Sequence, residues 1–294
     1  MANLNPQFIK KQIEDSYRQY YNSAFWIKNQ KLFKERDKLL NSNSLLSQDL
    51  QIELVPPYPS VTPIINICQK LNLGKDVAKV IAQVLFGSEH DETFKLRKHQ
   101  AQSLERSLQG SENSNVIVTS GTGSGKTESF LLPIITRIIK ERLNKNTPNI
   151  YPWWSSWDKT NKSWEGMRKD NNLSYKPAVR ALILYPTNAL VEDQISRLRQ
   201  AAFRAKNNNQ DRPLFYFGRY TGDTPGGLYY PSKSEKVNQK IILKVAAELI
   251  NIDNEARDLE GQDIEKRAQF SDPRCGEMIS RWDMIEAPPD FLIT

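Results

Sequence analysis

Apolar side chains near the start of the chain follow a helical period. Residues 7–40 contain no glycine or proline, and apolar side chains recur there every three or four positions, which predicts a helix. We expect this helix to pack against its own domain, and a coiled coil with a partner is the alternative. The positions that define its face are Ile13, Tyr17, Tyr20, Ala24 and Ile27. A proline-rich connector at residues 56–59 follows, and then a shorter helix around residues 76–86.

From about Lys95 onward, short apolar runs alternate with helical sequence. Strands are predicted at residues 115–119, 179–185, 214–217 and 290–293. Helices are predicted at about residues 126–143, 187–205 and 234–269, and Pro133 should kink the first of them. Strands that alternate with helices are typical of βαβ units and a parallel sheet. The expected fold class is therefore α/β.

A long polar insertion interrupts this alternation at residues 144–177. It contains four of the six tryptophans of the chain, Trp153, Trp154, Trp157 and Trp164. Indole rings can stack on nucleic-acid bases. We favour the simpler interpretation, that the rings form a small local core or cover an edge of the sheet.

Composition limits the class of protein. An apolar fraction of 38% and an aromatic fraction of 10% over 294 residues exclude a disordered chain. No run of 18 apolar residues and no apolar signal core at the N-terminus occur, so we expect a cytoplasmic protein. Two cysteines, Cys68 and Cys275, and two histidines, His90 and His99, are too scattered for a zinc site. The net charge of +7 permits nucleic-acid binding and equally describes an ordinary solvated surface.

The strongest chemical signal is the glycine-rich segment of residues 120–127, between a predicted strand and a predicted helix. Glycines let successive backbone N–H groups curl around a phosphate, and the helix N-terminus favours the negative charge. Lys126 is expected to reach the β- and γ-phosphates, and the Thr127 hydroxyl to bind Mg²⁺. These two are the candidate catalytic residues. The residues of this segment expected to bind ATP are Gly121, Thr122, Gly123, Ser124, Gly125, Lys126, Thr127 and Glu128.

One departure from the strict phosphate-loop pattern is informative, because Ser120 stands where that pattern has glycine. Such a loop resembles the form used by superfamily 2 helicases. Four further segments resemble motifs of that superfamily, in the same order and spacing: the adenine-sensing Q motif at residues 96–100, motif Ia at 185–190, motif Ib at 219–225, and the run before the DEAD/DEAH box at 288–294. With residues 53–58, they resemble the large bacterial DEAD/DEAH-box helicases related to Lhr and MrfA, several of which serve in DNA repair or phage defence.

This resemblance implies a RecA-like fold, ATP and Mg²⁺ as cofactors, and nucleic acid, specifically DNA, as partner. It implies that Arg97 and Gln100 of the Q motif also bind ATP, and that Gln100 senses adenine with its amide. Hydroxyls and backbone amides of motifs Ia, Ib and Ic would bind the sugar-phosphate backbone. The residues concerned are Pro186, Thr187, Asn188, Gln194, Thr221, Gly222 and Thr294. Taken alone, Pro186 and Thr187 would be read as an ordinary helix start.

The DEAD/DEAH box itself is absent from residues 128–294, where no apolar strand ends in Asp-Glu. We expect residues 1–93 to be a helical accessory region and residues 94–294 the first part of a RecA-like ATP-binding domain, which ends before that box. The carboxylate that positions water and the arginine finger of a second domain, both needed for hydrolysis, are then missing from these residues. The sequence therefore does not decide whether this chain alone is an enzyme. A complementing polypeptide is expected. A nucleotide- and nucleic-acid-binding adaptor without hydrolysis is the alternative, and the helicase motifs argue against another phosphate-loop enzyme.

Overall fold

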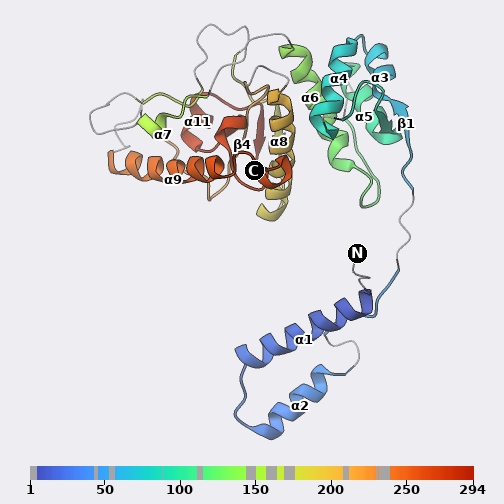
Figure 1. The fold of residues 1–294 in the computed structure, drawn as a ribbon, viewed down its shortest axis with the longest axis vertical. Coiled ribbons are helices and arrows are strands. Elements are labelled where there is room, and N and C mark those ends of the chain that lie inside the picture. Colours follow the sequence, from blue (N-terminus) through green and yellow to red (C-terminus); the bar gives the residue numbers. More distant parts are fainter. Residues whose placement is uncertain are drawn as a thin grey trace. The chain divides into compact units, whose positions relative to one another are not determined.

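The computed structural model describes residues 5–42, 46–52, 57–87, 89–110, 115–143, 150–156, 164–168, 176–207, 212–229, 231 and 239–294. The chain divides into two compact units, Met1–Pro56 and Pro57–Thr294, and the boundary falls at the proline-rich connector (Figure 1). None of the helices in these described ranges is long and apolar enough to cross a membrane.

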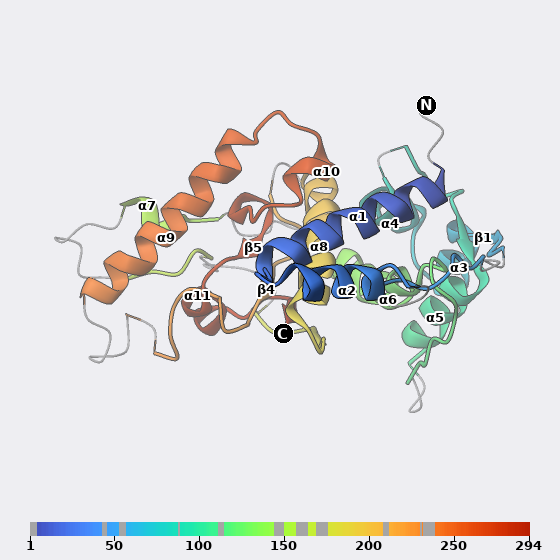
Figure 2. The same ribbon diagram turned by 90° about the horizontal axis from the view of Figure 1, so that it is seen from below.

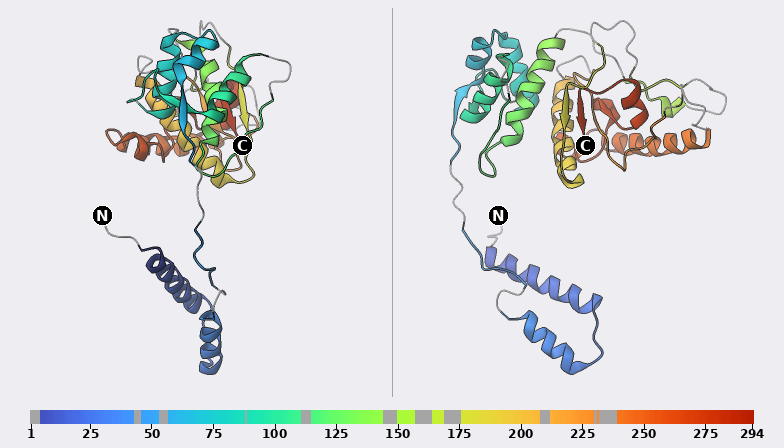
Figure 3. Two further views of the ribbon diagram at one scale, coloured as in Figure 1. Left: turned by 90° about the vertical axis from the view of Figure 1, so that its right-hand side faces the viewer. Right: turned by 180° about the vertical axis from the view of Figure 1, so that it is seen from behind.

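The first unit consists of two helices instead of the one expected over residues 7–40. Helix α1 spans Pro6–Ala24 and α2 spans Gln30–Leu40, and the blue ribbons of Figure 3 show them as a hairpin. The chain breaks between them because Asn29 caps α2, its Oδ1 accepting the Lys31 N–H at 2.9 Å. The expected apolar face is not covered within this unit, since Ile13 and Tyr20 are both 63% exposed.

The second unit begins with four helices that pack around a shared apolar core. They are α3 (Ile64–Lys70), α4 (Lys75–Phe86), α5 (Lys98–Leu108) and α6 (Lys126–Arg142), which are grouped together in Figure 1. Strands β1 (Ser60–Pro63) and β2 (Lys95–Arg97) pair antiparallel beside them. Residues 60–93, assigned above to the accessory region, thus pack against α5 and α6. The expected domain boundary at residue 93 stays a prediction.

A four-stranded parallel sheet confirms the α/β class. Its order is β3 (Ala181–Ile183), β6 (Phe291–Ile293), β4 (Phe217–Arg219) and β5 (Glu277–Met278). The central strand β6 pairs with both neighbours, so that Phe291 lies opposite Ala181 on one side and Phe217 on the other. Helix α8 (Asn188–Asn207) follows β3, and its buried face belongs to the core that also contains Phe217, Phe291 and Ile293. The third strand begins three residues later than expected, at Phe217.

The prediction of a buried strand over residues 115–119 is wrong. This segment pairs with no strand of the described chain, and Ile117 is 89% exposed. An apolar, β-branched run becomes a strand only when a neighbouring strand supplies hydrogen-bond partners. In the four-stranded sheet, β3 is an edge strand, and its Leu182 is 57% exposed.

The tryptophan-rich insertion contributes to a second apolar core. Trp153 and Trp154 of α7 (Trp153–Ser156) and the buried Trp164 pack with residues from α9 (Gln239–Asp258) and α11 (Arg281–Glu286). Figure 2 shows α7 alongside α9. The preferred interpretation, a local core, is therefore confirmed for these three rings, whereas Trp157 lies outside the described residues. Between α9 and β5 lie the short helices α10 (Ile264–Arg267) and η2 (Pro273–Cys275).

One buried carboxylate joins the insertion to α11. Asp283 accepts hydrogen bonds from the indole N–H of Trp153 at 3.1 Å, the backbone N–H of Met167 at 2.7 Å and the hydroxyl of Ser280 at 2.5 Å. These bonds favour the charged form, but burial outweighs them and raises the pKa of Asp283 from 3.8 to about 6.

This raised pKa predicts how stability changes with pH. Between about pH 4 and pH 6 the folded chain keeps a proton that the unfolded chain has already lost, so stability falls as pH rises through this window and levels off above it. The free energy of unfolding should drop by about 3 kcal/mol from this group. Urea unfolding at several pH values should show this fall in the free energy of unfolding in the native chain and not in Asp283→Asn. An equal slope in both chains would contradict the prediction.

Candidate nucleotide-binding site and nucleic-acid interface

The glycine-rich loop adopts the conformation that its spacing predicts. Gly123 and Gly125 have φ angles of +72° and +79°, in the left-handed region that favours glycine. A Cβ at Gly125 would also stand 2.5 Å from Nε2 of Gln100. The buried hydroxyl of Ser124 lies 2.6 Å from the hydroxyl of Ser120 and fixes the base of the loop. The loop leads directly into α6, so the helix N-terminus faces the site.

Lys126, the first residue of α6, closes this loop on itself. Its ammonium group donates a hydrogen bond to the backbone oxygen of Ser120 at 2.8 Å, and the side chain is exposed. A phosphate oxygen is a stronger, charge-assisted acceptor than a carbonyl. The ammonium is therefore free to transfer to a phosphate without leaving the loop. The neighbouring Thr127 is half-buried and lines the same cavity.

Gln100 and Arg97 connect the start of α5 to the loop. The Gln100 amide accepts the backbone N–H of Arg97 at 3.0 Å and donates to the backbone oxygen of Gly125 at 3.3 Å. The Arg97 guanidinium donates to the backbone oxygen of Gly123 at 2.8 Å. Both side chains thus reach the phosphate loop, although the oxygen and the nitrogen of the Gln100 amide each already bind a backbone group of the protein.

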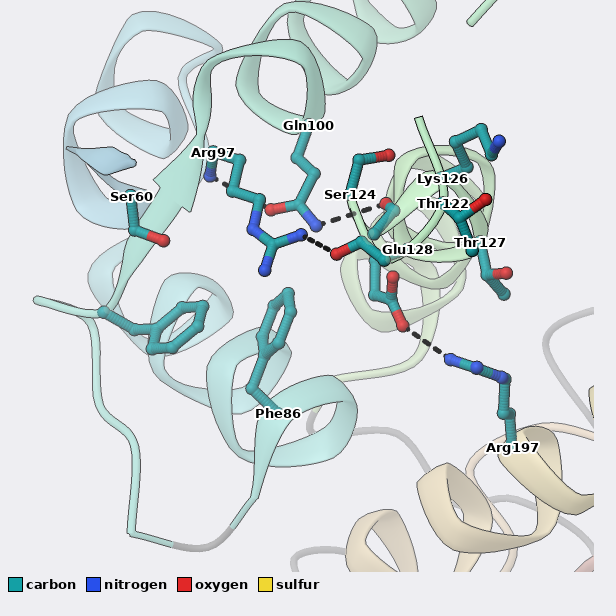
Figure 4. A pocket seen from close by; sticks show the side chains of 13 residues that line it. Ser60, Phe86, Arg97, Gln100, Thr122, Ser124, Lys126, Thr127, Glu128 and Arg197 are labelled. Carbon is teal, nitrogen blue, oxygen red and sulfur yellow. Dashed lines mark hydrogen bonds and ion pairs between the residues drawn. The ribbon is translucent and has the colours of Figure 1, made fainter. Parts of the chain in front are cut away.

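A cavity of about 480 Å³ lies between these groups (Figure 4). Its volume is within the range of small-molecule sites. The candidate residues Arg97, Gln100 and Thr122–Glu128 line it together. It also contains residues that the sequence analysis missed, namely Ser60, Phe86, Phe94 and Arg197. The rings of Phe86 and Phe94 stack with their centroids 4.3 Å apart and provide an apolar wall.

A neighbouring tyrosine also contacts the loop without having been expected to. The Tyr58 hydroxyl accepts the backbone N–H of Gly121 at 3.0 Å. The Tyr58 ring lies 5.8 Å from the guanidinium carbon of Arg97. Tyr58 is the last residue of the segment 53–58, which resembles one branch of helicases. That resemblance was the sequence signal from which its role could have been predicted.

An ion pair links the phosphate-loop helix to the helix after motif Ia. Arg197 on α8 binds Glu128 on α6 at 2.8 Å (Figure 4). It also binds Asp193 on its own helix at 3.3 Å. No spacing pattern predicts a contact between residues 128 and 197, because this contact depends on how the two helices pack.

A second cluster of candidate residues lies where the parallel strands end. The Tyr185 N–H donates to the Thr294 oxygen at 2.9 Å, and the Tyr220 N–H donates to the Ile293 oxygen at 2.8 Å. The segments that follow β3, β4 and β6 therefore meet at one edge of the sheet. In open α/β sheets this carboxyl edge is the usual place for ligands.

The seven candidate nucleic-acid residues are not equally placed at this edge. Pro186, Thr187 and Asn188 are exposed at the start of α8, and Gly222 and Thr294 are exposed as well. The Thr221 hydroxyl oxygen is buried and has no hydrogen-bond partner within the described chain. Gln194 is only 6% exposed, and its amide nitrogen donates to Asp193 at 2.9 Å. Gln194 is thus the candidate least available to a ligand.

Magnesium has no preformed protein cage in the part of the chain that the structure describes, since no group of three or more His, Cys, Asp or Glu residues converges there. The Thr127 hydroxyl, at the mouth of the phosphate loop, is the protein ligand expected for it.

Comparison with known proteins shows what the chain around this site is similar to. Residues 97–215 match the family of DEAD/DEAH box helicases. The matched segment includes the phosphate loop, motif Ia and the helix that follows. The chain is also 30% identical over 241 residues to the Druantia protein DruE of Escherichia coli (strain UMEA 4076-1). That alignment covers 80% of this chain and 11% of the relative. No solved structure matches the chain. The resemblance to superfamily 2 helicases, and with it the RecA-like fold, is confirmed.

Proposed function

We propose that this chain, whose residues 97–215 match the DEAD/DEAH box helicase family, binds ATP with Mg²⁺ and binds DNA as part of a strand-translocating motor. The single observation that supports it best is the convergence of the phosphate loop, Gln100 and Arg97 on one cavity. DNA, as opposed to RNA, follows from the branch of helicases that the motifs resemble. A role in DNA repair or phage defence follows from the same resemblance.

Each group in the cavity has a distinct task in this proposal. Lys126 neutralises the β- and γ-phosphates, and the loop amides and the N-terminus of α6 hold the remaining phosphate oxygens. Thr127 binds Mg²⁺, which supplies charge neutralisation at the β- and γ-phosphates when it is bound. Gln100 exchanges its protein partners for the edge of adenine. The remaining candidate residues shape and hold the loop, namely Gly121, Thr122, Gly123, Ser124, Gly125, Glu128 and Arg97.

The nucleic-acid partner is placed at the carboxyl edge of the sheet. Hydroxyls of Thr187, Thr221 and Thr294 and the amide of Gly222 suit contacts to phosphate and sugar that do not read sequence. Pro186, Asn188 and Gln194 position the segment that begins α8. The Arg197–Glu128 ion pair gives this edge a direct connection to the phosphate loop, because it joins α8 to α6.

We further propose that hydrolysis requires a polypeptide segment with a DEAD/DEAH box, whose apolar strand pairs with the free edge of β3. Two observations support this occupant. Leu182 in β3 is 57% exposed, and Leu184, just after this strand, is 69% exposed. Ile117, in the segment before the phosphate loop, is 89% exposed. A strand inserted here would cover apolar groups on both sides. The chain covers 11% of its relative DruE, so the whole relative's activity is not carried over directly.

A combined binding and turnover experiment tests this proposal. The purified chain should bind a fluorescent ATP analogue in a Mg²⁺-dependent way and bind single-stranded DNA, without measurable ATP hydrolysis. Addition of a polypeptide with the DEAD/DEAH box should produce DNA-stimulated hydrolysis. Robust turnover by the chain alone would contradict the completion proposal. Binding of both ligands without turnover in the completed complex would favour the non-hydrolysing adaptor.

Adenine recognition by Gln100 predicts a change in nucleotide selectivity. Gln100→Ala should weaken ATP binding roughly tenfold, because two hydrogen bonds to adenine are lost, and leave GTP binding nearly unchanged. Competition of ATP and of GTP against a fluorescent nucleotide measures the two affinities. Gln109→Ala, at the exposed end of α5, is the matched control. An equal loss for ATP and GTP would show that Gln100 only supports the loop.

A further inference from the structure

Arg281 lies beside the motif Ib turn, and no acidic residue in the described part of the chain pairs with it. It is the first residue of α11, and its backbone N–H donates to the Pro225 oxygen at 2.8 Å. Its guanidinium Nη2 donates to the backbone oxygens of Thr221 and, at 3.2 Å, Gly222. The guanidinium carbon is 5.2 Å from the centroid of the Tyr220 ring. Contacts from both backbone and side chain thus fix this arginine against residues 220–225.

The charge of Arg281 is not neutralised within the residues that the structure describes. Its neighbours there are carbonyl oxygens and an aromatic ring, and it forms no ion pair. Other structural arginines differ: Arg142 is paired with Asp290 at 2.5 Å and Arg199 with Glu277 at 2.7 Å. A half-buried guanidinium with donors to spare favours an anionic ligand, and the planar fork of arginine suits phosphate.

The turn that Arg281 contacts also has unused polar groups. Thr224 closes the turn, since its hydroxyl accepts the Thr221 N–H at 3.1 Å and donates to the Arg219 oxygen at 2.7 Å. The Thr221 hydroxyl oxygen is buried without a partner in the described chain, and a buried polar atom of this kind is costly unless a ligand bonds to it. Gly222 is exposed, with nothing within 4 Å of where a Cβ would stand. A phosphate group therefore has room to reach the turn.

We propose that Arg281 is a further phosphate-binding residue of the nucleic-acid interface, acting with Thr221 and Gly222 on one backbone phosphate. This inference rests on the proposed function and adds to it a cationic group from outside motif Ib, whose own Arg219 is paired with Glu192. The sequence analysis missed Arg281, which lies outside the motifs and about 60 residues after the turn that it contacts.

Salt dependence separates a phosphate contact from a purely structural role. Each phosphate that a protein cation neutralises on a single strand changes the slope of log affinity against log salt by about 0.7. Binding of single-stranded DNA by the full chain should be measured by fluorescence anisotropy over a range of NaCl concentrations. Arg281→Gln should weaken binding about tenfold at low salt and reduce the slope by about 0.7. Arg257→Gln, an exposed arginine on α9 with the same change of charge, should leave the slope unaltered.

Two further comparisons keep this test decisive. If Arg281→Gln does not fold, as judged by its melting temperature and binding of a fluorescent ATP analogue, Arg281→Lys replaces it. The lysine variant should keep the native slope but bind DNA more weakly, since an ammonium lacks the fork. Native affinity in Arg281→Lys, or weaker binding with an unchanged slope in Arg281→Gln, would overturn the proposal. Failure of the native chain to bind DNA would instead overturn the proposed function.

Discussion

Replacing Lys126 by alanine should weaken nucleotide binding by roughly 100-fold while the chain stays folded. A charge-assisted hydrogen bond to a phosphate is worth up to about 3 kcal/mol, which corresponds to about two orders of magnitude in affinity. The protein itself uses the Lys126 ammonium for one exposed hydrogen bond, to the Ser120 oxygen, so its removal should change stability little. Titration with a fluorescent ATP analogue in the presence of Mg²⁺ measures the loss.

A second lysine on the same helix is a matched control for this experiment. Lys140 is exposed near the other end of α6, and Lys140→Ala removes the same charge without touching the loop. We expect native affinity for the nucleotide in this variant. Equal losses in the two variants would indicate a general electrostatic effect, and native affinity in Lys126→Ala would contradict the phosphate-loop assignment.

Local sequence signals were sufficient to predict the phosphate loop and the helices α4, α6, α8 and α9, whereas α3, α5, α11 and β5 were not expected. Helix α6 begins at Lys126 and ends at Arg142, close to the expected span, and β6 lies within the expected last strand. These elements depend on properties read over a few residues: glycines where φ is positive, an apolar run, and helical periodicity. The roles of the individual loop residues stay predictions.

Contacts between distant segments were not predictable in the same way. The segment of residues 115–119 has the composition of a strand, yet pairing depends on a partner strand that local composition does not reveal. Arg281, Arg197 and Tyr58 each reach a candidate site through packing, and none carries a spacing signal by itself. Side chains that complete a site from another element are therefore the part that sequence patterns miss.

Loss of the Asp290 carboxylate should produce the largest loss of stability among the substitutions considered. Asp290 precedes β6 and binds Arg142 of α6 through two hydrogen bonds, at 2.7 and 2.5 Å, and both side chains are fully buried. It also binds Arg180 at 2.8 Å and accepts the Tyr216 N–H at 2.8 Å. Removal of one partner from a buried pair leaves an uncompensated charge and costs about 3–5 kcal/mol.

Urea unfolding of Asp290→Ala should therefore show a loss of about 3–5 kcal/mol, enough to remove much of the stability of an ordinary domain. Glu105→Ala, which removes one partner of the surface pair with Lys70, should cost about 1 kcal/mol or less. The double variant Arg142→Ala/Asp290→Ala should lose less than the sum of the two single losses, because no buried charge then lacks its partner. Arg142 ends the phosphate-loop helix and Asp290 directly precedes β6, so strict additivity would mean that this pair does not hold the helix to the central strand.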